Sequence, residues 1–263
     1  MKRVLILVNH EVVIYNFRKE LVERLLNDGY EVFISSPFGD KIKELVTMGC
    51  HHVALKIDRH STNPVGDMKL AKYYFDIMKQ IEPDVVLTYT IKPNIYGSLA
   101  AKRLKIPTIV NITGLGSAVA TKGILQKITI TLYRFALRKS LQVYFQNKHD
   151  QTFFLNHHIV QHNYALLPGS GVNLQHFKLL PYPDATSPVE FIFISRIMKK
   201  KGMDQYLEAA RYIKNKYPNT KFHICGFLED DYKKILNDYQ NEGIIEYHGM
   251  VRDIRLILSR VSC

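Results

Sequence analysis

The residues of this sequence with the clearest chemical potential are two cations that follow a short apolar run, Arg196 and Lys201. A guanidinium offers a planar fork of N–H donors that matches a pair of phosphate oxygens, and a lysine ammonium adds a compact charge. Together they could bind a diphosphate and stabilise the negative charge that builds on it as it leaves, which requires no metal. Taken by itself, the Lys199 to Lys201 stretch also suits an ordinary solvated turn.

The elements that must position these cations are a predicted strand before them and a predicted helix after them. Residues 191–194 form an apolar, β-rich run that is typical of a strand buried on both faces. Apolar residues recur at helical spacing over 203–214, so Gly202 marks a helix start. Charged ligands of open α/β sheets bind beyond the carboxyl ends of the strands. Ser195, Arg196, Lys201 and Gly202 are therefore expected at such an edge.

Strand and helix patterns alternate along the whole chain, which predicts an α/β fold with doubly wound parallel sheets. The predicted strands cover residues 4–8, 31–35, 52–56, 84–88, 107–111, 142–146, 164–167, 191–194, 221–225 and 244–247. The predicted helices cover residues 17–26, 40–48, 67–81, 94–104, 124–139, 148–157, 203–216, 230–240 and 253–259. Three prolines in residues 179–188 indicate a linker between a first domain, 1–178, and a second, 189–263. Three strands are few for a doubly wound domain, so the second is expected to be incomplete.

A block without acidic residues runs from Val85 to His149, within a chain of net charge +12. Such a block attracts phosphates of nucleic acid, lipid head groups or a diphosphate-linked substrate, or is an ordinary basic surface. Nucleic acid is disfavoured because no known nucleic-acid-binding motif accompanies the charge. Residues 124–139 within the block predict a basic amphipathic helix, which could lie on an anionic membrane surface or pack on a sheet. Its apolar residues are Ile124, Ile128, Leu132, Phe135 and Leu137.

Composition and motif spacing bear on the cellular location, the disulfides and the metal sites of the protein. No apolar run is long enough to span a bilayer, and the N-terminus lacks a signal-peptide pattern, so a cytoplasmic protein is expected. The three cysteines are far apart, without CxxC spacing, and the histidines show no metal-ligand spacing. We therefore predict neither a disulfide framework nor a metal site.

Several segments, in this order, resemble a retaining glycosyltransferase of family 4, with the two-domain GT-B fold built from Rossmann-like domains. They are NITGLGS (111–117), PGSGVN (168–173) with Phe177, SRIMKKKG (195–202), ICGFLED (224–230) and YHGMVRD (247–253). The pairing of YTIKPNIYG (89–97) with NITGLGS is similar to the bacterial subgroup that extends polyprenyl-diphosphate-linked sugars for capsule, O-antigen or protein glycans.

This resemblance implies transfer from a nucleotide sugar, expected to be UDP-linked, to a lipid-linked saccharide at the inner face of the cell membrane. It places the donor diphosphate on Arg196 and Lys201 and needs no cofactor or metal. The remaining donor-side positions are Gly171, Ser195, Gly202, Gly249, Met250 and Val251. The acceptor-side positions are Tyr89, Lys92, Asn94, Thr113, Gly114, Gly116 and Ser117.

The sequence departs from the family pattern at its C-terminal end. The family carries a glycine-rich loop and two glutamates that hold the donor sugar and ribose, and no such residues follow here. Weak or no transfer is therefore expected from this chain. No general base or nucleophile is assigned, because no His-Asp or paired-carboxylate constellation is evident and the resemblance implies that the donor phosphate itself serves.

Two other functions compete with transfer. The chain could be a non-catalytic module that binds only the acceptor and the membrane, in which case it binds lipid without nucleotide. A nicotinamide-dependent oxidoreductase is disfavoured, because the turn at residues 8–12, VNHEV, lacks the GxGxxG pattern.

Overall fold

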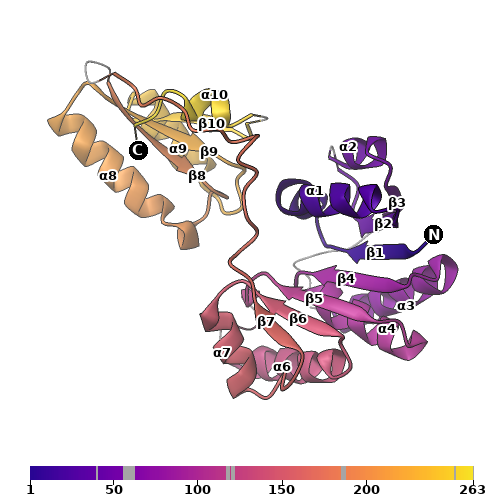
Figure 1. The fold of residues 1–263 in the computed structure, drawn as a ribbon. Coiled ribbons are helices and arrows are strands. Elements are labelled where there is room, and N and C mark those ends of the chain that lie inside the picture. Colours follow the sequence, from indigo (N-terminus) through magenta and orange to yellow (C-terminus); the bar gives the residue numbers. More distant parts are fainter. Residues whose placement is uncertain are drawn as a thin grey trace. The chain divides into compact units, whose positions relative to one another are not determined.

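A computed structural model describes residues 1–39, 41–55, 63–116, 119, 122–184, 188–251 and 253–262 of the chain. The chain divides into two compact units, Met1–Val172 and Asn173–Cys263 (Figure 1). The first unit thus ends before the boundary at residue 178 that the proline pattern suggested. No helix of the described residues is long and apolar enough to cross a membrane.

The first unit is built on a seven-stranded parallel sheet, as the alternating pattern predicted. Its strand order is β3-β2-β1-β4-β5-β6-β7, so that β1 pairs with β2 on one side and with β4 on the other. Ligands of such sheets bind where the winding direction changes, here between β1 and β4. The strands are β1 (Arg3–Leu7), β2 (Glu31–Ser36), β3 (His51–Ala54), β4 (Val85–Tyr89), β5 (Thr108–Ile112), β6 (Gln142–Phe145) and β7 (Tyr164–Leu166).

Helices cover both faces of this sheet because successive strand residues point to opposite sides. On one face, α1 (Glu11–Asn27) and α2 (Ile42–Thr47) pack against Val4 and Ile6. On the other, α3 (Pro64–Ile81) and α4 (Ser98–Leu104) pack against Leu5 and Leu7. A π-helical turn, η1 (Pro93–Gly97), opens α4.

Helix α1 differs from its predicted form in start and in orientation. It begins six positions before the predicted residue 17, because the His10 side chain accepts a hydrogen bond from Val12 N and caps the first turn. Its buried face carries Ile14 and Val22, whereas Phe17, which the sequence pattern places on one apolar face with Leu21 and Leu25, is 52% exposed. Apolar residues on both sides of this helix made the choice of face ambiguous in the sequence.

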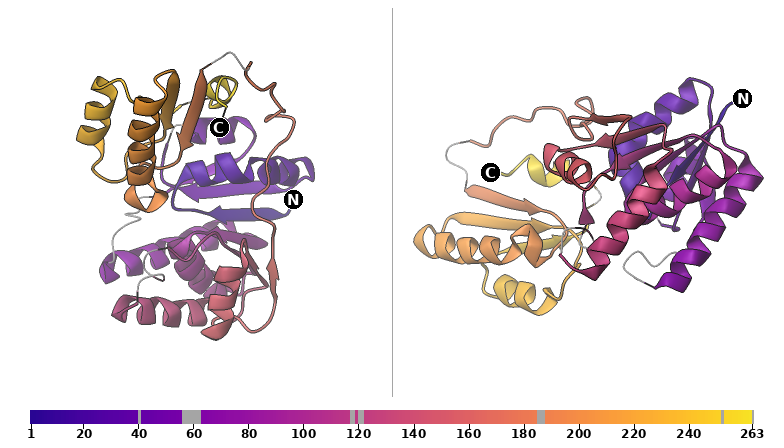
Figure 2. Two further views of the ribbon diagram at one scale, coloured as in Figure 1. Left: turned by 90° about the vertical axis from the view of Figure 1, so that its left-hand side faces the viewer. Right: turned by 90° about the horizontal axis from the view of Figure 1, so that it is seen from below.

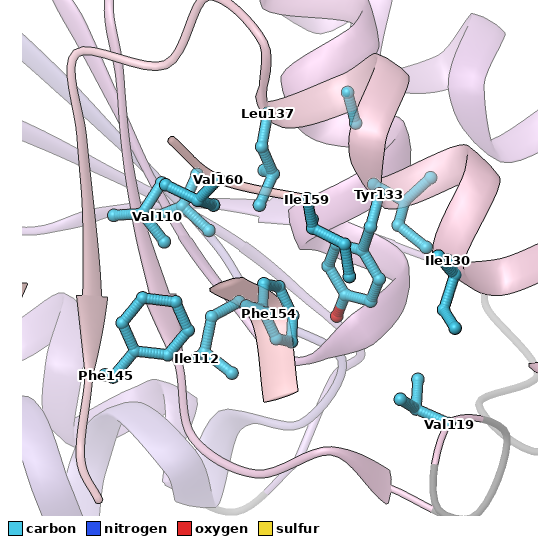
Figure 3. Close-up of a cluster of buried hydrophobic side chains, with 13 residues drawn as sticks. Val110, Ile112, Val119, Ile130, Tyr133, Leu137, Phe145, Phe154, Ile159 and Val160 are labelled. Carbon is cyan, nitrogen blue, oxygen red and sulfur yellow. The ribbon is translucent and has the colours of Figure 1, made fainter. Parts of the chain in front are cut away.

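The far end of the first unit has its own aromatic core beneath α6 (Ile124–Leu137) and α7 (Lys148–Asn156). Figure 3 shows Tyr133 of α6, Phe154 of α7 and Phe145 of β6 in the same cluster. The ring of Phe154 makes edge contacts with both others, at centroid distances of 5.1 and 5.2 Å. This packing fixes the orientation of α6, which matters for the residues it leaves exposed.

The second unit holds a three-stranded parallel sheet of order β10-β9-β8. Its strands are β8 (Val189–Ile194), β9 (Thr220–Cys225) and β10 (Glu246–Gly249). Helices α8 (Met203–Lys216) and α9 (Lys233–Asn241) cover one face, and α10 (Arg255–Leu258) lies on the other (Figure 2). A 3-10 turn, η2 (Lys199–Lys201), connects β8 to α8.

Candidate functional site

The carboxyl ends of the three strands in the second unit are locked together at one edge. Ser195 N donates to Cys225 O at 3.1 Å, and Gly226 N donates to Gly249 O at 2.8 Å. A Cβ at Gly226 would lie 1.7 Å from Ser195 O, so only glycine allows these segments to approach so closely. Two donor-side predictions, Ser195 and Gly249, are thus hydrogen-bonded to the adjacent residues Cys225 and Gly226.

The predicted diphosphate cations lie at this edge, between β8 and α8. Arg196 and Lys201 are both exposed, and the Arg196 side chain remains 47% accessible. Gly202 adopts a positive φ of 84° as the N-cap of α8 and supplies no side-chain hydrogen bond to the first turn. The N–H groups at the start of α8 therefore lack a side-chain cap and carry the positive end of the helix dipole. Cations and helix N-terminus favour an anion at the same edge.

Glu229 pairs with Arg196, and the sequence motifs had not singled it out for this role. Arg196 Nη1 lies 3.6 Å from Glu229 Oε1. The loops that carry them run side by side, because Ile197 bridges Leu228 and Ile197 O accepts from Glu229 N at 3.1 Å. This separation is longer than a direct hydrogen bond, so the carboxylate orients the guanidinium by charge attraction. A diphosphate could displace or share this contact.

The lysine next to this pair has a different environment. Lys199 Nζ lies 3.6 Å from Asp204 Oδ2, and Tyr232 donates to the other oxygen of Asp204 at 2.5 Å. That hydrogen bond to a carboxylate raises the pKa of Tyr232 to about 12. For Lys201 Nζ, no carboxylate within ion-pair distance is found among the described residues. Lys201 is therefore available to a ligand, as is Lys200, which is also exposed.

The remaining donor-side predictions follow β10 or lie in the other unit. Met250 is exposed and Val251 half-buried directly after Gly249, so their backbone continues from the locked edge. Gly171, with φ of 74°, belongs to the end of the first unit. Its neighbour Ser170 lies within hydrogen-bond distance of Gln146 there.

In the first unit, the predicted acceptor-side cation is already part of an ion pair. Lys92 Nζ lies 3.0 Å from Asp67 Oδ1, and both side chains are largely buried. Tyr96 of η1 donates to Asp67 Oδ2 at 2.8 Å. Burial and this carboxylate together raise the pKa of Tyr96. Lys92 thus contacts a carboxylate, which the acid-free block around it gave no reason to expect.

Two other acceptor-side predictions are core residues in this structure. Asn94 is 1% exposed, and its Nδ2 donates to Asn111 O at 3.1 Å, tying η1 to the end of β5. Tyr89 is also buried, with the Arg18 guanidinium 5.0 Å above its ring. Burial raises the pKa of Tyr89. Both side chains support the ends of strands in this structure, and their contact with an acceptor stays a prediction.

The glycine loop after β5 is more open. Thr113 and Gly116 are exposed, and Gly114 and Gly116 have positive φ of 155° and 66°. Ser117, the last residue predicted for this loop, lies outside the described residues. Gln146 links the loop base to its neighbours, since its Nε2 lies 3.4 Å from Asn111 Oδ1 and 3.3 Å from Ser170 Oγ. Gln146 was missed because its partners are remote in sequence.

Helix α6 presents apolar residues to solvent beside basic ones. It packs on the core through Ile130, Tyr133 and Leu137, so that, of the apolar residues named from the sequence, Leu137 lies on the side that packs on the sheet. Ile124, Ile128 and Phe135 are exposed, with Ile124 at 79%, and they recur at helical spacing on one stripe. The exposed cations Lys127, Arg134 and Arg138 lie on the same helix or directly after it. We call these six residues the α6 surface.

Both units match families of glycosyltransferases. Residues 3–147 match the family described as "Glycosyl transferase 4-like", and residues 182–263 match "Glycosyl transferases group 1". The chain is 24% identical over 258 residues to a Campylobacter jejuni protein, covering 92% of this chain and 68% of that one. That protein is named N,N'-diacetylbacillosaminyl-diphospho-undecaprenol alpha-1,3-N-acetylgalactosaminyltransferase.

Solved structures show the same fold. A glycosyltransferase from Rickettsia africae aligns with a TM-score of 0.71 at 19% identity, covering 99% of this chain and 71% of the other. HepE from Anabaena, in complex with UDP and glucose, aligns with a TM-score of 0.74 at 15% identity, covering 99% and 72%. At these identities the likeness concerns the fold, and it confirms the predicted GT-B architecture.

Proposed function

The chain belongs to the glycosyl transferase 4-like family, and from this premise we propose that it transfers a sugar from a UDP-linked donor to a polyprenyl-diphosphate-linked saccharide. The Campylobacter jejuni relative acts, by its name, on a diphospho-undecaprenol-linked substrate, and HepE has been solved with UDP. The observation that carries the proposal is the edge of the second unit, where Arg196, Lys201 and the N-terminus of α8 gather.

We propose that this edge binds the donor diphosphate. As the bond to the sugar breaks, negative charge moves onto the leaving diphosphate, and fixed donors stabilise that charge more strongly than the ground state. Arg196 supplies a fork for two oxygens, Lys201 a compact charge, and α8 its first-turn N–H groups. Glu229 holds the guanidinium in place before the donor arrives. The backbone after Gly249 is the proposed contact for the base.

Calorimetry with UDP tests the donor site. Replacing Arg196 with Ala removes a charge-assisted contact of about 1.5 to 3 kcal/mol, so UDP should bind roughly 10- to 100-fold more weakly. Lys200→Ala is the matched control, because Lys200 is an exposed cation of the same η2 turn. Equal UDP affinity of wild type and Arg196→Ala would contradict the site. Tighter binding of GDP or ADP than of UDP would contradict the choice of base.

Retention of the anomeric configuration is the second part of the proposal. It follows from the resemblance to family 4, in which the donor phosphate takes the proton of the attacking hydroxyl. Transfer from a UDP-sugar labelled at its anomeric carbon to a polyprenyl-diphosphate saccharide, followed by NMR of the product linkage, distinguishes retention from inversion. An inverted linkage would overturn the retaining assignment without affecting the donor site. We propose that no metal takes part in this step, so excess EDTA should leave the rate unchanged.

We propose that the α6 surface holds the first unit on an anionic membrane, where a lipid-linked acceptor resides. Its apolar stripe could enter the interface while its cations meet lipid head groups. Lys102 adds to the charge there, because its Nζ donates to Phe135 O at 3.0 Å. An exposed apolar stripe next to basic residues, within a block free of acidic ones, supports a membrane rather than an ordinary solvated face.

Flotation with vesicles tests the membrane proposal. The chain should float with vesicles rich in phosphatidylglycerol and much less with phosphatidylcholine. Ile128→Glu should reduce flotation, because it places a charge in the stripe, whereas Tyr212→Glu on the exposed side of α8 should not. Equal flotation of the Ile128→Glu variant would rule out α6 as the contact. Lipid binding without any UDP binding would instead favour the non-catalytic module.

A further inference from the structure

A cluster of two histidines and a glutamate lies on the sheet face of the second unit opposite α8 and α9. His223 Nδ1 and His248 Nε2 are 3.0 Å apart. Glu246 Oε2 lies 3.5 Å from the first nitrogen and 4.0 Å from the second. The donor-site proposal uses none of these side chains.

The sheet register explains why three residues so distant in sequence converge. His223 of β9 is the direct partner of Glu246 in β10. His248 lies two positions after Glu246 and therefore on the same face. The register shifts between Tyr247 and Gly249, and such an irregularity re-aims the side chain next to it. His248 is thus brought towards His223 at the end of β10.

The hydrogen bond between His223 Nε2 and Glu190 sets the tautomer of His223 and so decides whether its Nδ1 carries a proton. His223 is 2% exposed, and its Nε2 lies 2.8 Å from Glu190 Oε2. Lys221 holds the other oxygen of Glu190 at 2.9 Å. A carboxylate acceptor requires Nε2 to carry the proton, which leaves a lone pair on Nδ1. That lone pair faces the His248 nitrogen and the Glu246 carboxylate, so three electron-pair donors converge on one point.

We propose that His223 Nδ1, His248 Nε2 and the Glu246 carboxylate bind a zinc ion. Imidazole and carboxylate ligands at about 2.0 to 2.2 Å from a tetrahedral ion lie about 3.4 Å from one another, close to the separations in this cluster. Glu190 is the positioning residue, since it sets the tautomer of His223 as carboxylates do behind many zinc-bound histidines. The partial exposure of His248 and Glu246 gives an ion access and leaves the fourth position open to water.

The site has a structural consequence independent of the proposed transfer. An ion would join β9 to β10 directly before Gly249, and hence stabilise the edge strand of a small sheet. A ligand that binds only the folded state raises the unfolding temperature as its concentration increases. Zinc should therefore raise the unfolding temperature of the second unit, with or without a nucleotide.

Cobalt spectroscopy on the EDTA-treated full chain tests the site. Co²⁺ should give the intense visible bands of a four-coordinate ion, and Zn²⁺ should abolish them. His248→Ala and Glu246→Gln should each lose the bands and the zinc-dependent rise in unfolding temperature. His162→Ala, an exposed histidine of the first unit, is the matched control and should behave as wild type.

The role of Glu190 has a separate readout. Glu190→Gln should weaken zinc binding about 10- to 100-fold, and ¹⁵N NMR should show mixed tautomers of His223 in place of one. Far-UV circular dichroism establishes that each variant is folded. Absence of the cobalt bands in wild type, or unchanged bands in both His248→Ala and Glu246→Gln, would overturn the proposal. In that case the pair is a histidine–histidine hydrogen bond.

Discussion

The predicted ligand-binding cation at the carboxyl edge of the first sheet is largely buried, whereas the two at the carboxyl edge of the second are exposed. In the first unit, Lys92 contacts Asp67, and Asn94 is buried against the end of β5. In the second, Arg196 and Lys201 remain exposed beside a helix that begins without a side-chain cap. The first edge thus buries its cation in an ion pair, whereas the second keeps its positive groups accessible. The two cations differ in accessibility rather than in pairing, because Arg196 also has a carboxylate partner in Glu229 but keeps a 47% exposed side chain.

The largest expected loss of stability comes from the close backbone contact between Gly226 and Ser195 at the second edge. Gly226→Ala would place a methyl group 1.7 Å from Ser195 O, and we expect a loss of about 3 kcal/mol or more of unfolding free energy. Gly243→Ala is the control, because that glycine also has positive φ but no atom near its Cβ, so the cost should be about 1 kcal/mol. Urea unfolding of the two variants measures the difference. Equal costs would mean that the strand ends are not held rigidly.

A smaller effect is expected from the ion pair of the first edge. Asp67→Ala removes the carboxylate that Lys92 and Tyr96 both contact in a largely buried place, so it should cost about 2 to 3 kcal/mol. Asp76→Ala breaks an exposed pair with Lys72 in the same helix and should cost less than about 0.5 kcal/mol. Equal stability of the two variants in urea would mean that the pair of Lys92 with Asp67 contributes no more than an exposed ion pair.

The smallest expected effect on stability comes from the pair of Asp253 and Arg255 at the start of α10. Arg255 donates to Asp253 Oδ2 at 2.6 Å, and this hydrogen bond lowers the pKa of Asp253 to about 2. Because the folded-state pKa is depressed, the stabilisation is present above the unfolded-state pKa and is lost as the pH falls through the folded value. NMR titration of Arg255→Leu should move the pKa of Asp253 up to about 4. An unchanged pKa in that variant would point to another cause.

The sequence was informative where a feature depends on near neighbours. Strand and helix order follow from local periodicity, and the turn with Arg196 and Lys201 follows from a continuous motif. Contacts between remote segments were not predictable in this way, because side-chain pairing depends on register and loop path. Glu229 beside Arg196, Gln146 beside Ser170 and His248 beside His223 are of this kind.

Orientation was a second limit. Helix α1 has apolar residues on two sides, and only its packing on β1 distinguishes the face with Ile14 from the face with Phe17. For α6, the amphipathic pattern predicted a helix correctly, but part of its apolar side remains exposed because Tyr133 and Leu137 fill the core. Burial depends on the volume available beneath a helix, which periodicity does not contain.

The hydrogen bonds from Ser195 N and Gly226 N have a consequence for the thermodynamics of binding. Loops beside ligand sites commonly become ordered on binding, and the lost entropy reduces affinity. Here the strand ends are already joined by hydrogen bonds, so their amide hydrogens should exchange slowly with solvent before any nucleotide is added. Binding of a nucleotide should slow this exchange only a little more. Nucleotide binding at the proposed donor site should therefore carry a small entropic penalty.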